Sequence, residues 1–169
     1  MVEVSHIAAY VARRYEKQFA TAIDEIKLQK LLYFIQREHI IRFGTPMFDE
    51  QFRAWKYGPV LLSVHDKFKK GELCDVAVHD DDFTAQKEML DYIFSEYAGK
   101  TTMSLVGHSH CELSWIRARK GYGKYDKSDV PMQLQDIYDD ALLAMKRRAE
   151  LPARRKMYGF ITQQIPSTI

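Results

Sequence analysis

The chain has 169 residues, of which 46% are hydrophobic and 28% are charged. These proportions, with a mean hydropathy of −0.37, are typical of one soluble globular domain and exclude a disordered or membrane-embedded chain. Lysine and arginine number 25 against 23 acidic residues, so the net charge of +2 gives no indication of a nucleic acid or an acidic membrane as partner.

The N-terminal segment is predicted to form a helix with one buried face, because its apolar residues recur at spacings of three and four. Ser5 is a candidate N-cap for this helix. A second helix is predicted to begin at Asp24, whose carboxylate can accept free N–H groups of the first turn, and to end at Gly44, where a left-handed residue closes a helix. Pro46 follows and supports this end.

The second predicted helix is apolar around most of its circumference. Its main face, plotted at 100° per residue, consists of Leu28, Leu31, Leu32 and Ile35. Such a helix must be covered on several sides, so it is expected to be the central element of the fold. Between its faces Gln29 and Gln36 share one narrow stripe, and a buried amide without a partner would cost about 1–3 kcal/mol.

The aromatic segment 48–57 lacks helical periodicity and is predicted to form a turn and a short extended strand. Gly58 permits a sharp bend, and Pro59 is expected at the first position of a third helix that ends at Gly71. The loosely alternating segment 74–79 is a candidate partner for the extended strand.

Further along the chain, the acidic run 80–82 is predicted to be a loop and a helix start, and residues 121–129 a surface loop. Helical periodicity predicts further helices at residues 90–97, 103–110, 113–120 and 134–145. The predicted fold is therefore mainly α: a single compact multi-helix domain around a central buried helix, with a candidate two-stranded β element. It is expected to comprise residues 1–150, followed by a basic C-terminal tail at 151–169.

One cluster of side chains that can bind metal, His108 to Glu112, could be either a metal site or a structural part of the fold. Alternate residues on a helix point about 200° apart, so the two histidines could not share one ion, and no second ligand pair accompanies them. His110 and Glu112 are therefore expected to orient the turn before Trp115. Cys111 could be a thiol nucleophile, but a small core residue is the preferred interpretation. No metal, cofactor or catalytic residue is predicted.

Three other features have a structural and a functional interpretation. The glycine-rich segment 121–124 lacks the spacing of a phosphate loop, and the acidic run 80–82 lacks that of a calcium loop. Basic residues between 146 and 156 could contact phosphate, yet they also complement a helix C-terminus, and no DNA-binding motif accompanies them. The aromatic residues Trp55, Tyr57 and Trp115 could be interface residues, but core positions are favoured by their spacing.

Cysteine usage and apolar runs indicate a cytoplasmic location. Cys74 and Cys111 are far apart, and residues 1–21 lack the basic start and apolar centre of an export signal, so two reduced thiols are expected. No apolar run approaches the ~18 residues that a membrane-spanning helix requires.

Three blocks together resemble the Panacea domain: KLQKLLY at 27–33, AWKYGPV at 54–60 and SHCELSW at 109–115. This is the family of SocA-like antitoxins and of many "phage-associated" proteins, and the resemblance spans roughly residues 5–140. Ser114 departs from the family, which usually has proline there. The resemblance implies a mainly helical antitoxin domain that neutralises a cognate toxin by direct binding. Because the sequence also has no complete catalytic motif, the protein is not expected to be an enzyme.

The resemblance, together with the glutamine stripe and the aromatic turn, gives six structural motif residues and seven candidate partner-binding residues; Gln36, Lys56 and Tyr57 come from the stripe and the turn alone. The structural set is Lys27, Lys30, Tyr33, His110, Glu112 and Trp115. The candidate partner-binding set is Gln29, Gln36, Trp55, Lys56, Tyr57, Gly58 and Pro59.

Besides a toxin, the resemblance implies a second candidate partner, an ATP-dependent protease. A proteolytic adaptor that delivers the toxin to this protease is thus the alternative function, with residues 154–169 as the docking element. An enzyme built on His110, Cys111 and Glu112, and a DNA-binding autoregulator, are further alternatives.

Overall fold

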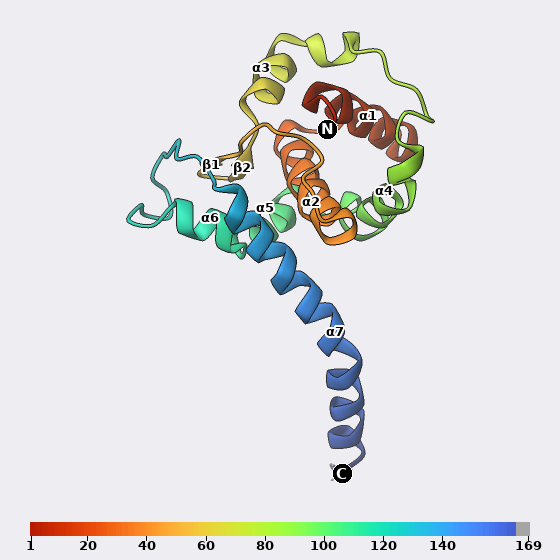
Figure 1. The fold of residues 1–169 in the computed structure, drawn as a ribbon, viewed down its shortest axis with the longest axis vertical. Helices are drawn as coiled ribbons and strands as arrows, with labels where there is room; N and C mark the ends of the chain where they lie inside the picture. The colour runs from red at the N-terminus through yellow and green to blue at the C-terminus, as the bar shows by residue number, and fades with distance from the viewer. Residues whose placement is uncertain (165–169) are drawn as a thin grey trace.

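The computed structural model describes the backbone of residues 1–164 and the side chains of residues 1–152, and it is mainly helical (Figure 1). Its helices and strands are α1 (Val4–Phe19), α2 (Glu25–Phe43), β1 (Arg53–Trp55), β2 (Gly58–Val60), α3 (Leu62–Lys70), α4 (Lys87–Ile93), α5 (Thr102–His110), α6 (Leu113–Ala118) and α7 (Leu134–Gln164). Short 3-10 turns lie at Glu72–Asp75 and Thr84–Gln86, and a π-helical segment, Phe94–Ala98, continues α4.

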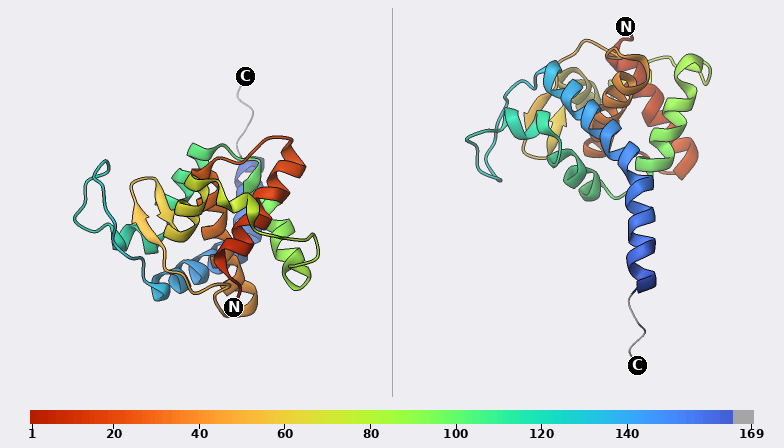
Figure 2. Two further views of the ribbon diagram at one scale, coloured as in Figure 1. Left: turned by 90° about the horizontal axis from the view of Figure 1, so that it is seen from above. Right: turned by 60° about the horizontal axis from the view of Figure 1, so that its bottom comes forward.

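Helix α2 is the centre of the fold, as predicted. Helices α1, α4, α5 and α7 and the β1–β2 hairpin surround it (Figures 1 and 2), and every residue from Lys27 to Ile40 is buried. Its ends are also those predicted: the Asp24 carboxylate accepts a hydrogen bond from the Lys27 N–H at 2.9 Å, and Gly44 closes the helix at φ 73°. Burial on all sides explains why this helix lacks a polar face.

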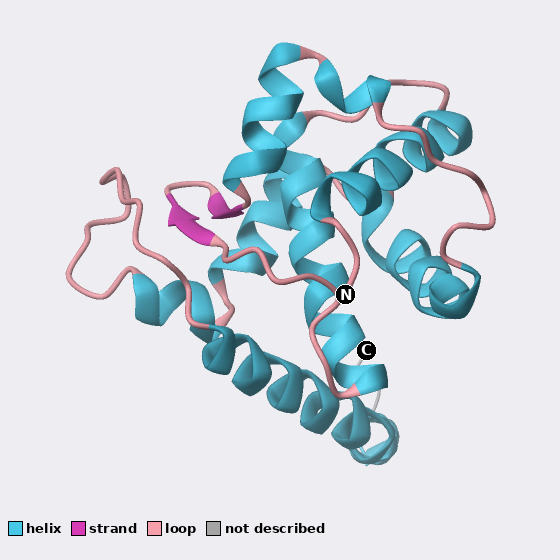
Figure 3. Cartoon of the chain, turned by 45° about the horizontal axis from the view of Figure 1, so that its top comes forward, coloured by secondary structure: helices cyan, strands magenta, loops and turns pink. Residues whose placement is uncertain are grey.

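The small β element is present, but its second strand is not the predicted one. Strand β1 pairs antiparallel with β2 across the two-residue turn Lys56–Tyr57 (Figure 3), whereas the segment 74–79, expected to supply the partner, leaves a 3-10 turn without pairing. Pro59 therefore lies in a strand and not at a helix start. Pro59 is paired with Ala54, and these two residues do not exchange hydrogen bonds, because the Ala54 N–H points away from β2 and donates to the Val130 carbonyl at 2.8 Å. The strand pair therefore does not need the N–H that proline lacks.

Two local expectations are wrong. Helix α1 begins at Val4 with Glu3 as the preceding residue, so Ser5 is not the N-cap; it is buried in the first turn, where its hydroxyl donates to the Glu3 carboxylate. Cys111 is exposed, not a core residue, because it follows the last turn of α5 on the surface.

Helix α7 packs its first half against α2 and α6 and then leaves the body of the molecule (Figures 1 and 2). Arg148 holds the last packed turn through two hydrogen bonds to the buried Glu38 carboxylate, at 3.1 and 2.7 Å. The helix continues through Pro152 to Gln164, so it does not end near Arg148 as expected. The expected tail beyond residue 164 lies outside the described residues. No helix in the described part of the chain is both long and apolar enough to cross a membrane.

Candidate functional site

The β1–β2 hairpin turn and the loop before α7 form one exposed surface. Tyr57 is 45% exposed and Tyr125, from the loop, is 71% exposed. The Lys56 ammonium bridges them, at 5.1 Å from the Tyr57 ring centroid and 5.5 Å from that of Tyr125. Exposed tyrosines of this kind are enriched at protein interfaces.

A pocket of about 720 Å³ lies beside this turn. It is lined by the first turns of α2, the hairpin, α3 and the loop at residues 127–129. Trp55 is one of its lining residues: the indole N–H donates to the Asp129 carboxylate at 2.9 Å, and the ring lies edge-on to the His65 imidazole at 5.0 Å. Trp55 is partly exposed and Tyr57 exposed, so the core positions favoured by spacing are wrong for both; Trp115 is buried.

Lys30 is a pocket-lining residue with an unusual environment. It is 1% exposed, its ammonium donates to the Pro59 carbonyl at 2.8 Å, and no carboxylate lies within 4.0 Å of it in the described part of the chain. Burial lowers the pKa of Lys30 from 10.5 to about 7, although the nearby negative charges of Glu25 and Asp24 oppose this shift. The other lysine of the first block, Lys27, is also buried and donates to the Tyr15 hydroxyl at 3.0 Å.

Gly58 allows the hairpin to approach the helices closely. Its φ is +100°, and an added Cβ would lie 2.4 Å from Ser109 Oγ and 2.6 Å from Lys30 Cε. The hairpin can therefore pack against α2 and α5 only with glycine at this position.

The two glutamines of the predicted stripe both bind main-chain groups. The Gln29 amide donates to the Leu61 carbonyl at 3.1 Å and accepts from the Leu61 N–H at 2.9 Å. Gln36 makes equivalent contacts with Met47 and Phe48, at 2.8 to 3.3 Å. Both are buried; Gln29 lines the pocket, whereas Gln36 supports the segment that precedes β1.

The third block connects the hairpin to the helices. The His110 ring stacks on Trp115 with centroids 3.8 Å apart, and the Trp115 indole N–H donates to the Trp55 carbonyl at 3.0 Å. Burial, followed by the positive charge of Lys30, lowers the pKa of His110. These contacts place the exposed hairpin turn on a rigid support.

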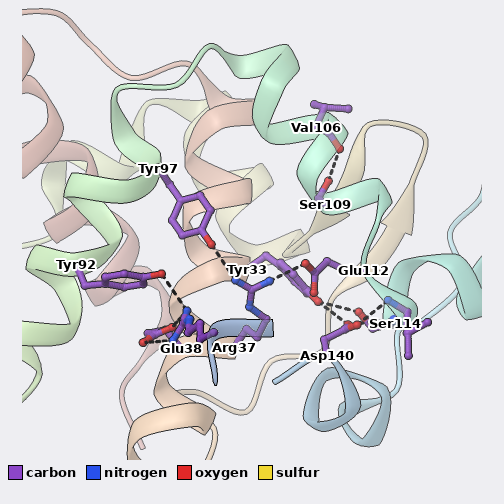
Figure 4. A network of polar contacts seen from close by, with 12 residues as sticks. Tyr33, Arg37, Glu38, Tyr92, Tyr97, Val106, Ser109, Glu112, Ser114 and Asp140 are labelled. Carbon is purple, nitrogen blue, oxygen red and sulfur yellow. Dashed lines mark hydrogen bonds and ion pairs between the residues drawn. The ribbon is translucent and has the colours of Figure 1, made fainter. Parts of the chain in front are cut away.

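Buried polar contacts tie α2 to α6 and α7 (Figure 4). Arg37 donates to the Glu112 carboxylate at 2.6 Å and to the Tyr97 hydroxyl at 2.9 Å. The Tyr33 hydroxyl donates to Asp140 at 2.8 Å, and Asp140 also accepts the N–H groups of Leu113 and Ser114 at the start of α6. Burial, more than the nearby carboxylates, raises the pKa of the Tyr33 hydroxyl.

The sequence profile of one family, "Antitoxin SocA-like, Panacea domain", matches residues 28–116, which are more than half of the chain. The chain belongs to this family. The match extends from α2 to α6, so this Panacea domain includes the hairpin, Lys30 and the His110–Trp115 segment. No curated protein and no solved structure shows a significant match.

One departure from the Panacea pattern has a structural counterpart. Ser114, where the family usually has proline, donates its N–H to Asp140 at 3.0 Å, and its hydroxyl contacts the Tyr33 hydroxyl at 2.9 Å. Proline has no N–H and could not make the first contact. In this Panacea domain the turn before Trp115 is therefore held by hydrogen bonds to the Asp140 carboxylate of α7.

The enzyme alternative would require the third block to converge on one point. The structure instead directs Glu112 toward Arg37 and His110 onto Trp115, while Cys111 is exposed. Among the described residues, no three histidine, cysteine, aspartate or glutamate side chains could hold one metal ion.

Several residues of the site were not among those predicted from the sequence. They are His65, Tyr125, Lys127 and Asp129. Asp129 lies 74 positions from the tryptophan that it binds, and no local pattern signals such a contact. The exposed aromatic residue in a glycine-containing loop, Tyr125, was the one available sign of this surface.

Proposed function

We propose that this protein is a cytoplasmic antitoxin that neutralises a cognate toxin by direct binding and not by an enzymatic reaction. Family membership supports the general function. The main support for the proposed binding surface is that Tyr57 and Tyr125 are both exposed beside a largely apolar pocket. Exposed aromatic residues next to a preformed pocket are the usual anchors of a protein interface.

Replacing Tyr57 with alanine tests this surface. We expect the affinity for the toxin encoded beside the antitoxin gene to fall at least about tenfold, because an interface tyrosine is commonly worth 1.4 kcal/mol or more. Affinity is measured by calorimetry, and neutralisation by growth of cells that express the toxin. Phe43→Ala is a matched control, since Phe43 is 46% exposed but lies at the opposite end of α2. Unchanged affinity in Tyr57→Ala would remove the hairpin turn from the interface.

A second candidate function, the proteolytic adaptor, is motivated by the way α7 leaves the body of the molecule (Figure 2). A helix that extends beyond its own packing partners can be reached by another protein. If this arm docks the protease, removing residues 154–169 should lengthen the toxin half-life in cells several-fold without weakening toxin binding. An unchanged half-life would contradict the adaptor function, and a loss of toxin binding would assign the arm to the toxin interface instead.

A further inference from the structure

The pocket beside the hairpin contains a buried cation without a counter-ion. Lys30 donates one hydrogen bond, to the Pro59 carbonyl, although an ammonium has three N–H groups to offer. The described residues place no carboxylate within 4.0 Å of it. A buried charge is normally paired, so an anion brought by another molecule would stabilise the charged form of Lys30.

The other charged groups of the pocket increase this preference. Lys56 and Lys127 also line it, and neither forms an ion pair within the described part of the chain. Its two carboxylates are already engaged: Glu25 contacts His65 at 2.5 Å and Lys69 at 3.4 Å, and Asp129 accepts the Trp55 indole N–H. Three lysines without an ion pair in the described part of the chain therefore line a largely apolar pocket, and Lys30 is the most buried of them.

We propose that this pocket receives a carboxylate of the toxin, carried on a segment with an adjacent apolar side chain, and that the carboxylate pairs with the Lys30 ammonium. The inference rests on the antitoxin function proposed above and names the chemistry of its contact. Apolar walls around one buried cation suit a single carboxylate on an apolar stem. A nucleic acid would instead require a track of exposed cations and base-stacking surfaces.

The lowered pKa of Lys30 provides an additional sign of this contact. A carboxylate beside the amine favours its charged form, so binding should raise that pKa and take up a proton near pH 7. The other charged or titratable groups around Lys30 in the described part of the chain are Asp24, Glu25, Lys56, Tyr57, His65, His110, Lys127 and Asp129.

The pocket chemistry can be tested without the toxin. The intact chain is titrated at pH 6 with 4-phenylbutyrate and with its uncharged analogue 4-phenylbutyramide, and the NMR signals of the two indole N–H groups are followed. We expect the acid to bind at least about tenfold more tightly than the amide, with the Trp55 signal shifting more than that of Trp115. Lys30→Met should abolish the preference, whereas Lys70→Met, at an exposed position outside the pocket, should retain it. Equal affinities for acid and amide, or no shift of Trp55, would overturn the inference.

The toxin experiment separates this inference from the proposed function. Lys30→Met should lower toxin affinity at least about tenfold while circular dichroism shows a folded chain. Lys127→Ala, which removes no hydrogen bond within the described part of the chain, should lower toxin affinity about threefold, and it serves as the test if Lys30→Met does not fold. If the toxin binds both variants as tightly as wild type, the carboxylate contact is contradicted, whereas the proposed antitoxin function is not. If the wild-type chain binds no toxin, the proposed function fails and the acid–amide comparison decides the pocket chemistry. Lys30-dependent binding of a single-stranded oligonucleotide in place of the acid would overturn the inference in favour of nucleic acid.

Discussion

Replacing Arg37 with methionine is expected to lower the free energy of unfolding by about 3–5 kcal/mol. The Arg37 and Glu112 side chains are only 7% and 8% exposed, and their charged atoms lie 2.6 Å apart (Figure 4). Removing the guanidinium leaves the Glu112 carboxylate buried without a counter-charge, and it also removes the donor to the Tyr97 hydroxyl. Burial already raises the pKa of Glu112, and Arg37 opposes that shift. Chemical denaturation at neutral pH measures the loss.

Two control variants decide whether the cause is the unpaired carboxylate. Adding Glu112→Gln to Arg37→Met should recover much of the lost stability, because the buried negative charge is then gone. Arg117→Met breaks an exposed pair with Asp136 and Asp139 and should cost less than about 1 kcal/mol. Equal losses in Arg37→Met and Arg117→Met would show that the buried pair contributes no more than an exposed one.

Replacing Gly58 with alanine is expected to destabilise the fold by about 2–4 kcal/mol. Two effects add: an L-residue at φ +100° costs about 1–2 kcal/mol, and forcing extra atoms into a packed interior costs about 1–3 kcal/mol. The added Cβ would displace Ser109 Oγ and the end of the Lys30 side chain, so the hairpin would move away from α5. Thermal and denaturant unfolding of the variant measure the effect.

The matched control is Gly107→Ala in α5. An added Cβ there meets nothing within 4 Å, and alanine favours a helix over glycine by about 1 kcal/mol. Gly107→Ala should therefore be neutral or stabilising. A Gly58→Ala variant as stable as wild type would mean that the hairpin can shift at no cost.

The contrast between α2 and the β hairpin shows which parts of the fold were predictable. Helix α2 was placed correctly because its start at Asp24, its end at Gly44 and its all-round apolar surface are local properties of consecutive residues. Strands of three residues carry no such periodic signal, so the partner of β1 was assigned to the wrong segment. Which segment pairs with β1 depended on the contacts of both strands with α2 and the loop before α7.

The candidate site was predictable to a smaller extent. The hairpin turn, with Trp55, Lys56 and Tyr57, was expected because a Trp-Lys-Tyr-Gly-Pro sequence is aromatic and stiff. The pocket beside it was not expected, since one part of its wall comes from residues 127–129, which the Ala54–Val130 and Trp55–Asp129 hydrogen bonds bring to the hairpin. Spacing along the chain contains no information about such contacts.

The sequence by itself therefore determined a helical domain around α2, its family and the block of residues that forms the exposed turn. Only the tertiary structure decided that Lys30 is buried beside that turn with no counter-ion among the described residues, and that Arg37 and Asp140 join the central helix to α6 and α7. The physical reason is that periodicity and capping are set by neighbours within one or two helical turns. The pairing of a buried charge, in contrast, is set by which distant segments pack against it.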